Sequence, residues 1–303
     1  MDFLYFLEDL RTPLGDAVFS ALTHLGGETV FLVAALVVFW CLDKRQGYYL
    51  LSVGFMGTLV NQFLKITCRI PRPWVRDPGF TIVESARAEA TGYSFPSGHS
   101  TSSVGTFGVI AVEAKQRWLR LTAAALCLLV PFTRLYLGVH TPADVLVGSA
   151  ISLVFLFLLR PVIYRDNGRL MPRMLGVMLL LAAGFVGYME LFPFPADVDA
   201  ENLHSALKNS YTLLGALTGM IVVYYADRKL CFPTGGVWYA QVLKCVLGLA
   251  LVLLVKEGLK LPLNALLGGH MAERAIRYMA VVLVAGILWP LTFPWFGELG
   301  QRK

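Results

Sequence analysis

Long apolar stretches recur along almost the whole chain, and each is close to the length that an α-helix needs to cross a bilayer. Such a helix takes about 20 predominantly apolar residues. Only 15% of the residues are charged and 56% are hydrophobic, whereas soluble domains carry roughly 25% charged residues. Because backbone polar groups inside lipid must be satisfied within the spanning segment, the sequence predicts an all-α, polytopic membrane helical bundle.

Nine stretches have the composition of spanning helices. We place them at residues 22–42, 47–66, 98–114, 118–138, 142–160, 173–192, 207–226, 239–261 and 274–296. The first and the third are marginal in length or polarity. Residues 1–27 are amphipathic and contain Pro13, so we expect part of this segment to lie along the interface or to form a re-entrant helix. Acidic residues stand where a signal peptide has basic ones, and we expect no cleaved signal peptide.

Basic residues are concentrated in one set of loops. These loops carry Lys44, Arg45, Lys115, Arg117, Arg120, Arg160, Arg165, Arg169, Arg173, Arg228, Lys229, Arg302 and Lys303. Because cytoplasmic loops are enriched in Lys and Arg, we expect the N-terminus outside and the C-terminus inside. This distribution accounts for the formal net charge of +6, and we expect no nucleic-acid partner.

Three short polar clusters interrupt the apolar sequence. They are Lys65 with Arg72-Pro73, then Pro96-Ser97-Gly98-His99, then Thr133-Arg134 with His140 and Asp144. Each alone is explained by a turn, a helix cap or a snorkelling side chain. Under the topology above all three lie on the outer side, and this joint placement favours a single functional site.

The fixed cations of these clusters suit phosphate chemistry. A transferring phosphoryl group spreads negative charge over its oxygens, which Lys65, Arg72 and Arg134 can stabilise. Pro71 and Pro73 flank Arg72 and fix the backbone there. An unpaired guanidinium in the membrane costs about 2.5 kcal/mol or more, and an anionic ligand would remove that cost at Arg134.

Two of the clusters read as helix starts. Ser97 is a plausible N-cap and Gly98 permits close backbone approach, so the free N–H groups of this helix can bind an anion. His99 then stands beside the anion and is suited to act as general acid. At the other helix start, Asp144 can orient one nitrogen of His140 and leave the other free to attack phosphorus.

Together the clusters resemble the signature of the type 2 phosphatidic acid phosphatase (PAP2) superfamily, which is Lys-x6-Arg-Pro, Pro-Ser-Gly-His and Ser-Arg-x5-His-x3-Asp. Thr133 is the one departure, since it replaces serine but keeps the hydroxyl. The resemblance implies a metal-independent phosphoric ester hydrolase without a cofactor. It also implies that His140 is the nucleophile that forms a phosphohistidine intermediate, that Asp144 is the partner of His140, and that His99 is the general acid. The implied phosphate-binding residues are Lys65, Arg72, Ser97, Gly98 and Arg134.

The resemblance covers residues 15–160. We therefore expect a catalytic PAP2-like helical core over residues 1–160 and an accessory four-span region over residues 161–303. The five cysteines show no paired spacing, so neither a disulfide framework nor a zinc site is expected.

The leading functional hypothesis is a phosphatase of lipid phosphate monoesters, of the phosphatidate or sphingoid-base phosphate type, in a bacterial-type cytoplasmic membrane with its active site on the extracytoplasmic face. The alternatives are an undecaprenyl-diphosphate phosphatase and a phosphatase of soluble esters resembling glucose 6-phosphatase. The expected partners are the phosphorylated lipid substrate and membrane lipids, and the oligomeric state stays open.

A lipid transporter is the non-enzymatic alternative. It is suggested by ionisable residues inside the expected spans of the accessory region, namely Glu190, Lys256, Glu257 and Lys260. Such residues are functional candidates by default in a membrane, although an internal ion pair or a snorkelling helix end also explains them.

Overall fold

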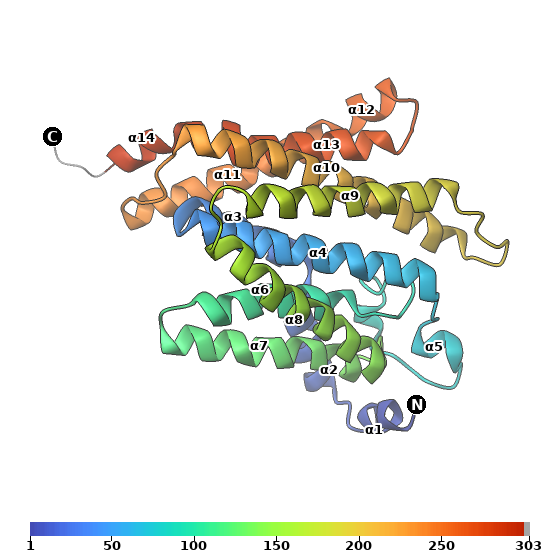
Figure 1. Cartoon of the computed structure of the whole chain (residues 1–303). Coiled ribbons are helices and arrows are strands. Elements are labelled where there is room, and N and C mark those ends of the chain that lie inside the picture. Colours follow the sequence, from blue (N-terminus) through green and yellow to red (C-terminus); the bar gives the residue numbers. More distant parts are fainter. Residues whose placement is uncertain (300–303) are drawn as a thin grey trace. The chain divides into compact units, whose positions relative to one another are not determined.

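Every regular element in the described part of the chain, residues 1–299, is helical in the computed structural model (Figure 1). This confirms the all-α prediction. The first half contains α1 (Asp2–Asp9), α2 (Pro13–Thr23), η1 (His24–Gly26), α3 (Glu28–Cys41), α4 (Lys44–Cys68), α5 (Pro73–Arg76), η2 (Glu84–Ala86), α6 (Gly98–Glu113), α7 (Arg117–Tyr136) and α8 (Pro142–Tyr164). The second half contains α9 (Leu170–Leu191), α10 (Ala200–Leu230), α11 (Trp238–Gly258), α12 (Lys260–Leu266), α13 (Ala272–Leu283), η3 (Val284–Leu288), η4 (Pro290–Thr292) and α14 (Phe293–Glu298).

Seven helical stretches within residues 1–299 are long and apolar enough to cross a membrane. They are Lys44–Arg76, Arg117–Tyr136, Pro142–Tyr164, Leu170–Leu191, Ala200–Leu230, Trp238–Leu266 and Ala272–Glu298. A further pair, Pro13–Gly26 with Glu28–Cys41, passes the same test together but is bent by 49°. The chain is therefore a membrane protein with seven or eight candidate spans.

Two of the nine expected spans look different in the structure. The span placed at 22–42 belongs to the bent pair, which has the form of a broken span or a re-entrant segment. The span placed at 98–114 is α6, which has 16 residues and is short of the roughly 20 that cross a bilayer. The count of nine and the orientation of the chain stay predictions.

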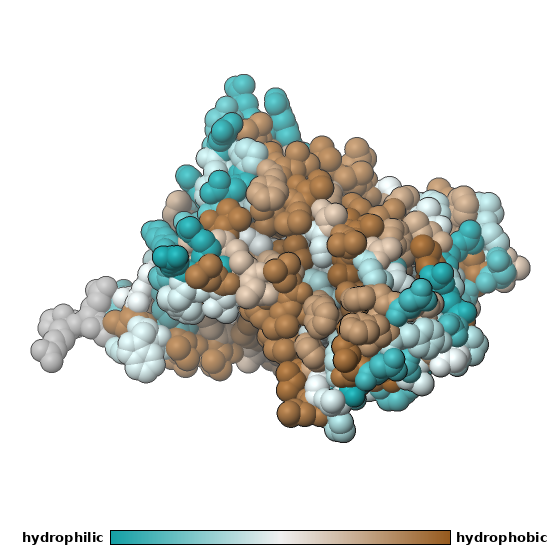
Figure 2. Space-filling view, turned by 90° about the horizontal axis from the view of Figure 1, so that it is seen from below, coloured by the Kyte–Doolittle hydropathy of each residue, from teal (hydrophilic) through white to brown (hydrophobic). Residues whose placement is uncertain are grey.

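Large apolar side chains cover the outward face of α8. Leu146, Val154, Phe157 and Leu158 are all more than half exposed. Figure 2 shows apolar residues gathered in a broad area with hydrophilic residues at its margins. Apolar surface of this extent is typical of contact with lipid.

The chain forms two compact units. The first comprises Met1–Ala34, Tyr49–Arg160 and Phe194–Ala206, and the second comprises Ala35–Tyr48, Pro161–Pro193 and Leu207–Lys303, of which residues 300–303 lie outside the described part. The assignment of catalytic and accessory roles to residues 1–160 and 161–303 stays a prediction.

Small and hydroxyl side chains join the helices of the first unit. Thr101 of α6 donates from Oγ1 to the carbonyl oxygen of Gly148 in α8 at 3.0 Å, and Ser152 Oγ donates back to the carbonyl oxygen of Thr101 at 2.5 Å. Asn61 of α4 donates to Thr101 Oγ1 at 3.0 Å. Such hydrogen bonds and close backbone contacts hold helices together where lipid removes the hydrophobic driving force between them.

The second unit contains a buried lysine. Lys244 is 1% exposed, and its Nζ donates to the carbonyl oxygen of Trp40 at 2.9 Å and lies 4.4 Å from the ring centroid of Phe293. The thiols of Cys41 and Cys245 lie beside it with their sulfurs 3.2 Å apart. Sequence spacing had not paired these two cysteines, because they are brought together only by the packing of α3 and α11.

We predict that Gly148→Ala destabilises the protein by about 1–3 kcal/mol, because overpacking of this kind forces backbone shifts. A Cβ at Gly148 would lie 2.5 Å from the carbonyl oxygen of Ser97 and would push α8 away from α6. Thermal unfolding in detergent measures the effect. The matched control is Gly176→Ala in α9, where a Cβ meets nothing within 4 Å; equal midpoints for the two variants would contradict the close contact.

Candidate active site

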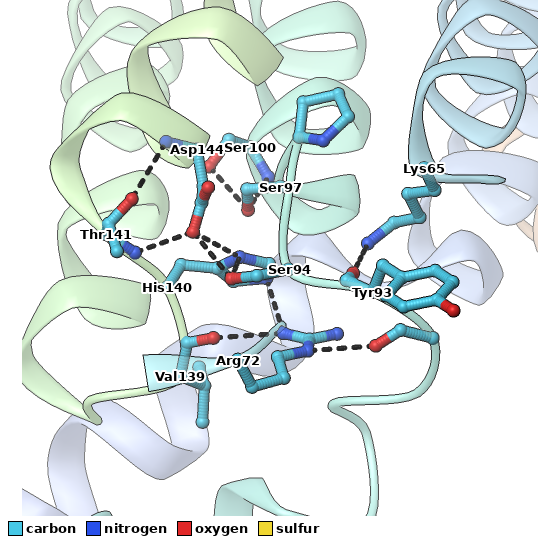
Figure 3. A network of polar contacts seen from close by, with 12 residues as sticks. Lys65, Arg72, Tyr93, Ser94, Ser97, Ser100, Val139, His140, Thr141 and Asp144 are labelled. Atoms are coloured by element: carbon cyan, nitrogen blue, oxygen red, sulfur yellow. Dashed lines mark hydrogen bonds and ion pairs between the residues drawn. The ribbon is translucent and has the colours of Figure 1, made fainter. Parts of the chain in front are cut away.

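The three polar clusters meet in the first unit, although they are spread over some 80 residues of sequence. Arg72 contacts His140, with 2.9 Å between Nη1 and Nε2. The backbone N–H of Ser97 donates to the carbonyl oxygen of Asp144 at 2.9 Å. The residues lie at the ends of α4, α6, α7 and α8, so these helix ends converge on one polar site (Figure 3).

His140 is buried just before α8, and its contacts define which nitrogen carries the proton. Its side chain is 2% exposed. A guanidinium has no acceptor, so Arg72 must donate to Nε2 of His140. Nε2 therefore holds a lone pair and Nδ1 carries the hydrogen, which faces Asp144 with 3.5 Å between Nδ1 and Oδ2. The nitrogen without a proton is the one that lies beside the cations.

Asp144 lies in the first turn of α8 and is held by three donors. Its Oδ2 accepts from the backbone N–H of Thr141 at 2.7 Å and from Ser94 Oγ at 2.6 Å, besides facing His140 (Figure 3). Ser94 is fully buried. The sequence analysis did not identify Ser94, because a lone serine in a loop belongs to no recognisable spacing. The one available signal was its position two residues before the Pro96-Ser97-Gly98-His99 cluster.

Arg72 lies at the start of α5 and holds the loop that precedes α6. It donates from Nε to the carbonyl oxygen of Gly92 at 3.1 Å and from Nη2 to that of Thr91 at 2.7 Å. Lys65, near the end of α4, donates from Nζ to the carbonyl oxygen of Tyr93 at 2.5 Å. Both predicted phosphate-binding cations therefore contact loop carbonyls.

The start of α6 follows the sequence prediction. Ser97 is the N-cap, and its Oγ accepts from the backbone N–H of Ser100 at 3.3 Å and from Ser100 Oγ at 2.9 Å. Gly98 is the first residue of the helix, and a Cβ there would have only Asn61 Oδ1 close by, at 3.8 Å. The free N–H groups of this first turn are available to an anion.

His99 has a partner that the sequence did not reveal. Its Nε2 lies 3.2 Å from Oε2 of Glu89, and the other oxygen of Glu89, Oε1, lies 2.7 Å from Nδ1 of His24. A Cβ at Gly26 would lie 3.2 Å from Cβ of His99, so the η1 turn packs directly on this histidine. The segment expected at the interface thus contributes to the site.

Arg134 is fully buried at the end of α7 and is only partly satisfied. Nη1 donates to Thr23 Oγ1 at 2.6 Å. Within residues 1–299, its Nε and Nη2 have no hydrogen-bond partner, and buried unpaired donors of a charged group are costly. The adjacent Thr133 donates from Oγ1 to the carbonyl oxygen of Val130 at 2.6 Å, so its hydroxyl is used within α7.

The two histidines both have a pKa below the ordinary value. Burial, together with the nearby cations Arg72 and Lys65, keeps the pKa of His140 well below its ordinary value. Burial also lowers the pKa of His99 to about 4, although the Glu89 carboxylate favours the charged form. The hydrogen bond from His99 lowers the pKa of Glu89 to about 2, so Glu89 is a carboxylate throughout the physiological range.

Glu190, Lys256 and Glu257 of the accessory region each contact a polar group. Glu190 Oε1 accepts from the hydroxyl of Tyr211 at 2.9 Å. Lys256 and Glu257 form a 3.5 Å ion pair with exposed side chains, and Lys260 begins α12. These contacts do not link the four residues into one buried polar path. Within residues 1–299, no group of three or more His, Cys, Asp or Glu side chains is placed to hold a metal ion.

Comparison with known families matches two parts of the chain. Residues 45–168 match the PAP2 superfamily, and residues 211–302 match a family described as PAP2 superfamily phosphatase, transmembrane extension. The first match contains all three clusters. No solved structure matches the chain significantly.

Several phosphatases resemble about half of the chain. Phosphatidylglycerophosphatase B of Bacillus subtilis is 29% identical over 164 residues, which cover 50% of this chain and 76% of the relative. Lipid A 4'-phosphatase of Bacteroides thetaiotaomicron is 24% identical over 160 residues, covering 49% and 70%. Undecaprenyl-diphosphatase BcrC of Bacillus subtilis is 30% identical over 127 residues, covering 41% and 63%.

The unpaired nitrogens of Arg134 predict an anion-binding site. We expect inorganic phosphate at about 100 times its dissociation constant to stabilise the wild-type protein by about 2.7 kcal/mol. Arg134→Gln should lose most of this stabilisation, measured as the shift of the thermal midpoint in detergent. Arg87→Gln removes an exposed arginine that is paired with Glu84 and serves as control; an undiminished shift in Arg134→Gln would be inconsistent with phosphate at this guanidinium.

Proposed function

The chain belongs to the PAP2 superfamily, and from this membership and the site geometry we propose that it is an integral-membrane phosphatase of lipid phosphate monoesters. The observation that carries the proposal is the hydrogen bond from Arg72 to Nε2 of His140 at 2.9 Å. It leaves the lone pair on the nitrogen beside the cations, where a phosphorus atom would be attacked.

In the first step the Nε2 lone pair of His140 attacks phosphorus and the P–O bond to the lipid alcohol breaks. The leaving oxygen takes a proton from the imidazolium of His99, so the alcohol departs neutral. The phosphate dianion that enters the site favours the protonated form of His99. Asp144 accepts from Nδ1–H of His140 and stabilises the positive charge that develops on this ring.

In the second step water hydrolyses the phosphohistidine. Neutral His99 takes a proton from the water, whose oxygen attacks phosphorus, and the P–N bond breaks and returns its electron pair to Nε2 of His140. Inorganic phosphate leaves, and His99 is again protonated for the next cycle.

The three cations and the start of α6 hold the phosphoryl oxygens in both steps. Arg134 offers two unpaired nitrogens, and Ser97 and Gly98 open the helix whose N–H groups face the site. Lys65 and Arg72 add positive charge beside these oxygens. Preorganised donors of this kind lower the barrier because they need no reorganisation as charge develops.

A phosphorylated lipid is the substrate class that fits a site at the ends of membrane helices. We propose phosphatidate or a sphingoid-base phosphate, presented to an extracytoplasmic face of a bacterial-type cytoplasmic membrane. Lys115 and Arg117 lie in the connection between α6 and α7, at the ends of these helices that are remote from the site. Because cytoplasmic loops are enriched in basic residues, this supports a cytoplasmic position for the connection and an extracytoplasmic one for the site. Residues 1–160 would carry the chemistry and residues 161–303 the accessory role.

Undecaprenyl diphosphate is the second candidate substrate, and the similarity to undecaprenyl-diphosphatase BcrC favours it. A diphosphate carries a second phosphate beyond the scissile bond, and its negative charge would need a cation other than Lys65, Arg72 and Arg134. Arg76 and Arg87 lie in the segment between Arg72 and Ser97, and both are exposed.

We predict that His140→Ala reduces phosphate release from phosphatidate in detergent by at least about 10³-fold, the scale of loss when a covalent nucleophile is removed. Radiolabelled substrate should give a phosphoenzyme that is stable to base and labile to acid in the wild type and absent in the variant. His204→Ala, which alters an exposed histidine, is the control. Undiminished hydrolysis by His140→Ala would refute the nucleophile, and lipid transport without hydrolysis would favour the transporter.

A second prediction concerns the substrate. Purified protein should hydrolyse phosphatidate or sphingoid-base phosphates with a higher kcat/KM than undecaprenyl diphosphate or glucose 6-phosphate, because the lipid tail remains in the bilayer while the headgroup enters the site. A fixed panel of these four substrates in mixed micelles measures the order. A higher value for the diphosphate would replace the monoester proposal with the undecaprenyl one.

A further inference from the structure

The candidate site contains a second carboxylate–histidine pair besides Asp144 and His140. Glu89 Oε2 lies 3.2 Å from His99 Nε2, and Glu89 Oε1 lies 2.7 Å from His24 Nδ1. The carboxylate thus bridges two imidazoles that are far apart in sequence. The three-part PAP2 signature includes His99 but neither Glu89 nor His24.

We propose that Glu89 is the positioning residue of the proton donor His99, and that His24 anchors Glu89 in this role. The inference rests on the proposed phosphatase function. The carboxylate accepts from Nε2–H of His99, fixes the tautomer and the ring orientation, and leaves Nδ1 to exchange the proton with the leaving oxygen and later with water. This arrangement repeats at His99 the relation that Asp144 has to His140.

The loop that carries Glu89 is held in place by the phosphate-binding cations. Arg72 donates to the carbonyl oxygens of Thr91 and Gly92 at 2.7 and 3.1 Å, and Lys65 donates to that of Tyr93 at 2.5 Å. These contacts lie two to four residues after Glu89. The loop that carries the Glu89 carboxylate is therefore held by the same cations that would bind the substrate.

The other side of the bridge is also fixed. His24 begins the η1 turn, and Gly26 of this turn packs so closely on His99 that an added Cβ would lie 3.1 Å from the His99 carbonyl oxygen. The turn has no room for a larger residue there. His24 is consequently carried to Glu89 by a segment that already contacts His99.

The charges around His99 give Glu89 a specific task. The guanidiniums of Arg134 and Arg72 and the burial of the ring all oppose protonation of His99, whereas Glu89 favours it. His140 is the other titratable group that interacts with His99, and it is held neutral. A proton donor must be charged before it can act, and Glu89 supplies the compensating negative charge at 3.2 Å.

The test compares Glu89→Gln with wild type on two kinds of substrate in detergent. A phosphate ester of an alkyl alcohol needs a proton on its leaving oxygen, whereas p-nitrophenyl phosphate has a leaving group that departs as an anion. We expect kcat for phosphatidate at pH 8 to fall about 10-fold or more, as a part of the roughly 10²–10⁴-fold that a general acid contributes, and kcat for the aryl ester to change less than about threefold. His24→Gln should show the same pattern with a smaller loss.

The pH profile provides an independent readout. His99 acts in its protonated form, so activity is lost as pH rises through the pKa of this group. Loss of the neighbouring negative charge lowers that pKa, and the alkaline limb of kcat should move to lower pH by about one unit in Glu89→Gln. Glu89→Asp keeps the charge and should keep the limb close to that of the wild type.

The matched control is Glu84→Gln, which removes a carboxylate of the same loop that pairs with Arg87 at 2.7 Å. It should leave both substrates and the pH profile unchanged. Equal losses on both substrates in Glu89→Gln, with an unmoved alkaline limb, would reduce Glu89 to a structural residue and overturn the proposal. If Glu89→Gln does not fold, the comparison of His24→Gln with Glu89→Asp decides by the same two readouts.

The same experiment separates this inference from the proposed function. His140→Ala should abolish hydrolysis of both the alkyl and the aryl ester. If it does, and Glu89→Gln behaves as Glu84→Gln does, only the role of Glu89 fails. If His140→Ala retains hydrolysis, the phosphohistidine mechanism fails first.

Discussion

The guanidinium of Arg72 is the interaction on which the rest of the candidate site depends. Its nitrogens donate to the carbonyl oxygens of Thr91, Gly92 and Val139 and to Nε2 of His140. One side chain thereby fixes the loop before α6, the approach to α8 and the tautomer of the proposed nucleophile. Because an arginine cannot accept a hydrogen bond or lose its proton under ordinary conditions, this choice of residue leaves no freedom in where the lone pair of His140 lies.

Burying polar groups in a membrane costs free energy unless these groups have hydrogen-bond partners. The first unit supplies many of these partners from its own side chains. Thr101, Ser152 and Asn61 form hydrogen bonds between α4, α6 and α8 next to the site. The first turn of α6 turns free N–H groups toward it, which an anion can use. Arg134 is the charged exception among the predicted site residues, since two of its buried nitrogens have no partner within the described residues, and Oδ1 of the neighbouring Asn61 also lacks one. A phosphate in this position would complete the same pattern of internal satisfaction.

Much of the fold and the core of the site could be predicted from the sequence, because both rest on local signals. The length of the apolar stretches predicts helices. The spacing of Arg72, His99 and His140 forms a motif that can be recognised in the sequence without knowledge of the packing. Ser94, Glu89 and His24 could not be found in this way, because each is a single polar residue in a segment without periodicity. Their roles arise from contacts across long sequence separations, such as His24 with Glu89. The short α6 and the break between α2 and α3 lie where the sequence already indicated a marginal span and a re-entrant segment, whereas the 49° angle of the bend depends on packing.

The two carboxylate–histidine pairs differ in burial, and this difference matches the two tasks that hydrolysis requires. Asp144 and His140 have side chains only 2% exposed, which favours a neutral ring with a lone pair in the proposed nucleophile. Glu89 and His99 are 35% and 16% exposed, which allows the ring to exchange protons with water between the two steps. Titratable groups whose environments differ in this way divide acid and nucleophile roles in one site. The N-terminal segment, which brings His24 to the more exposed pair, therefore contributes to the candidate site through this contact as well as through packing.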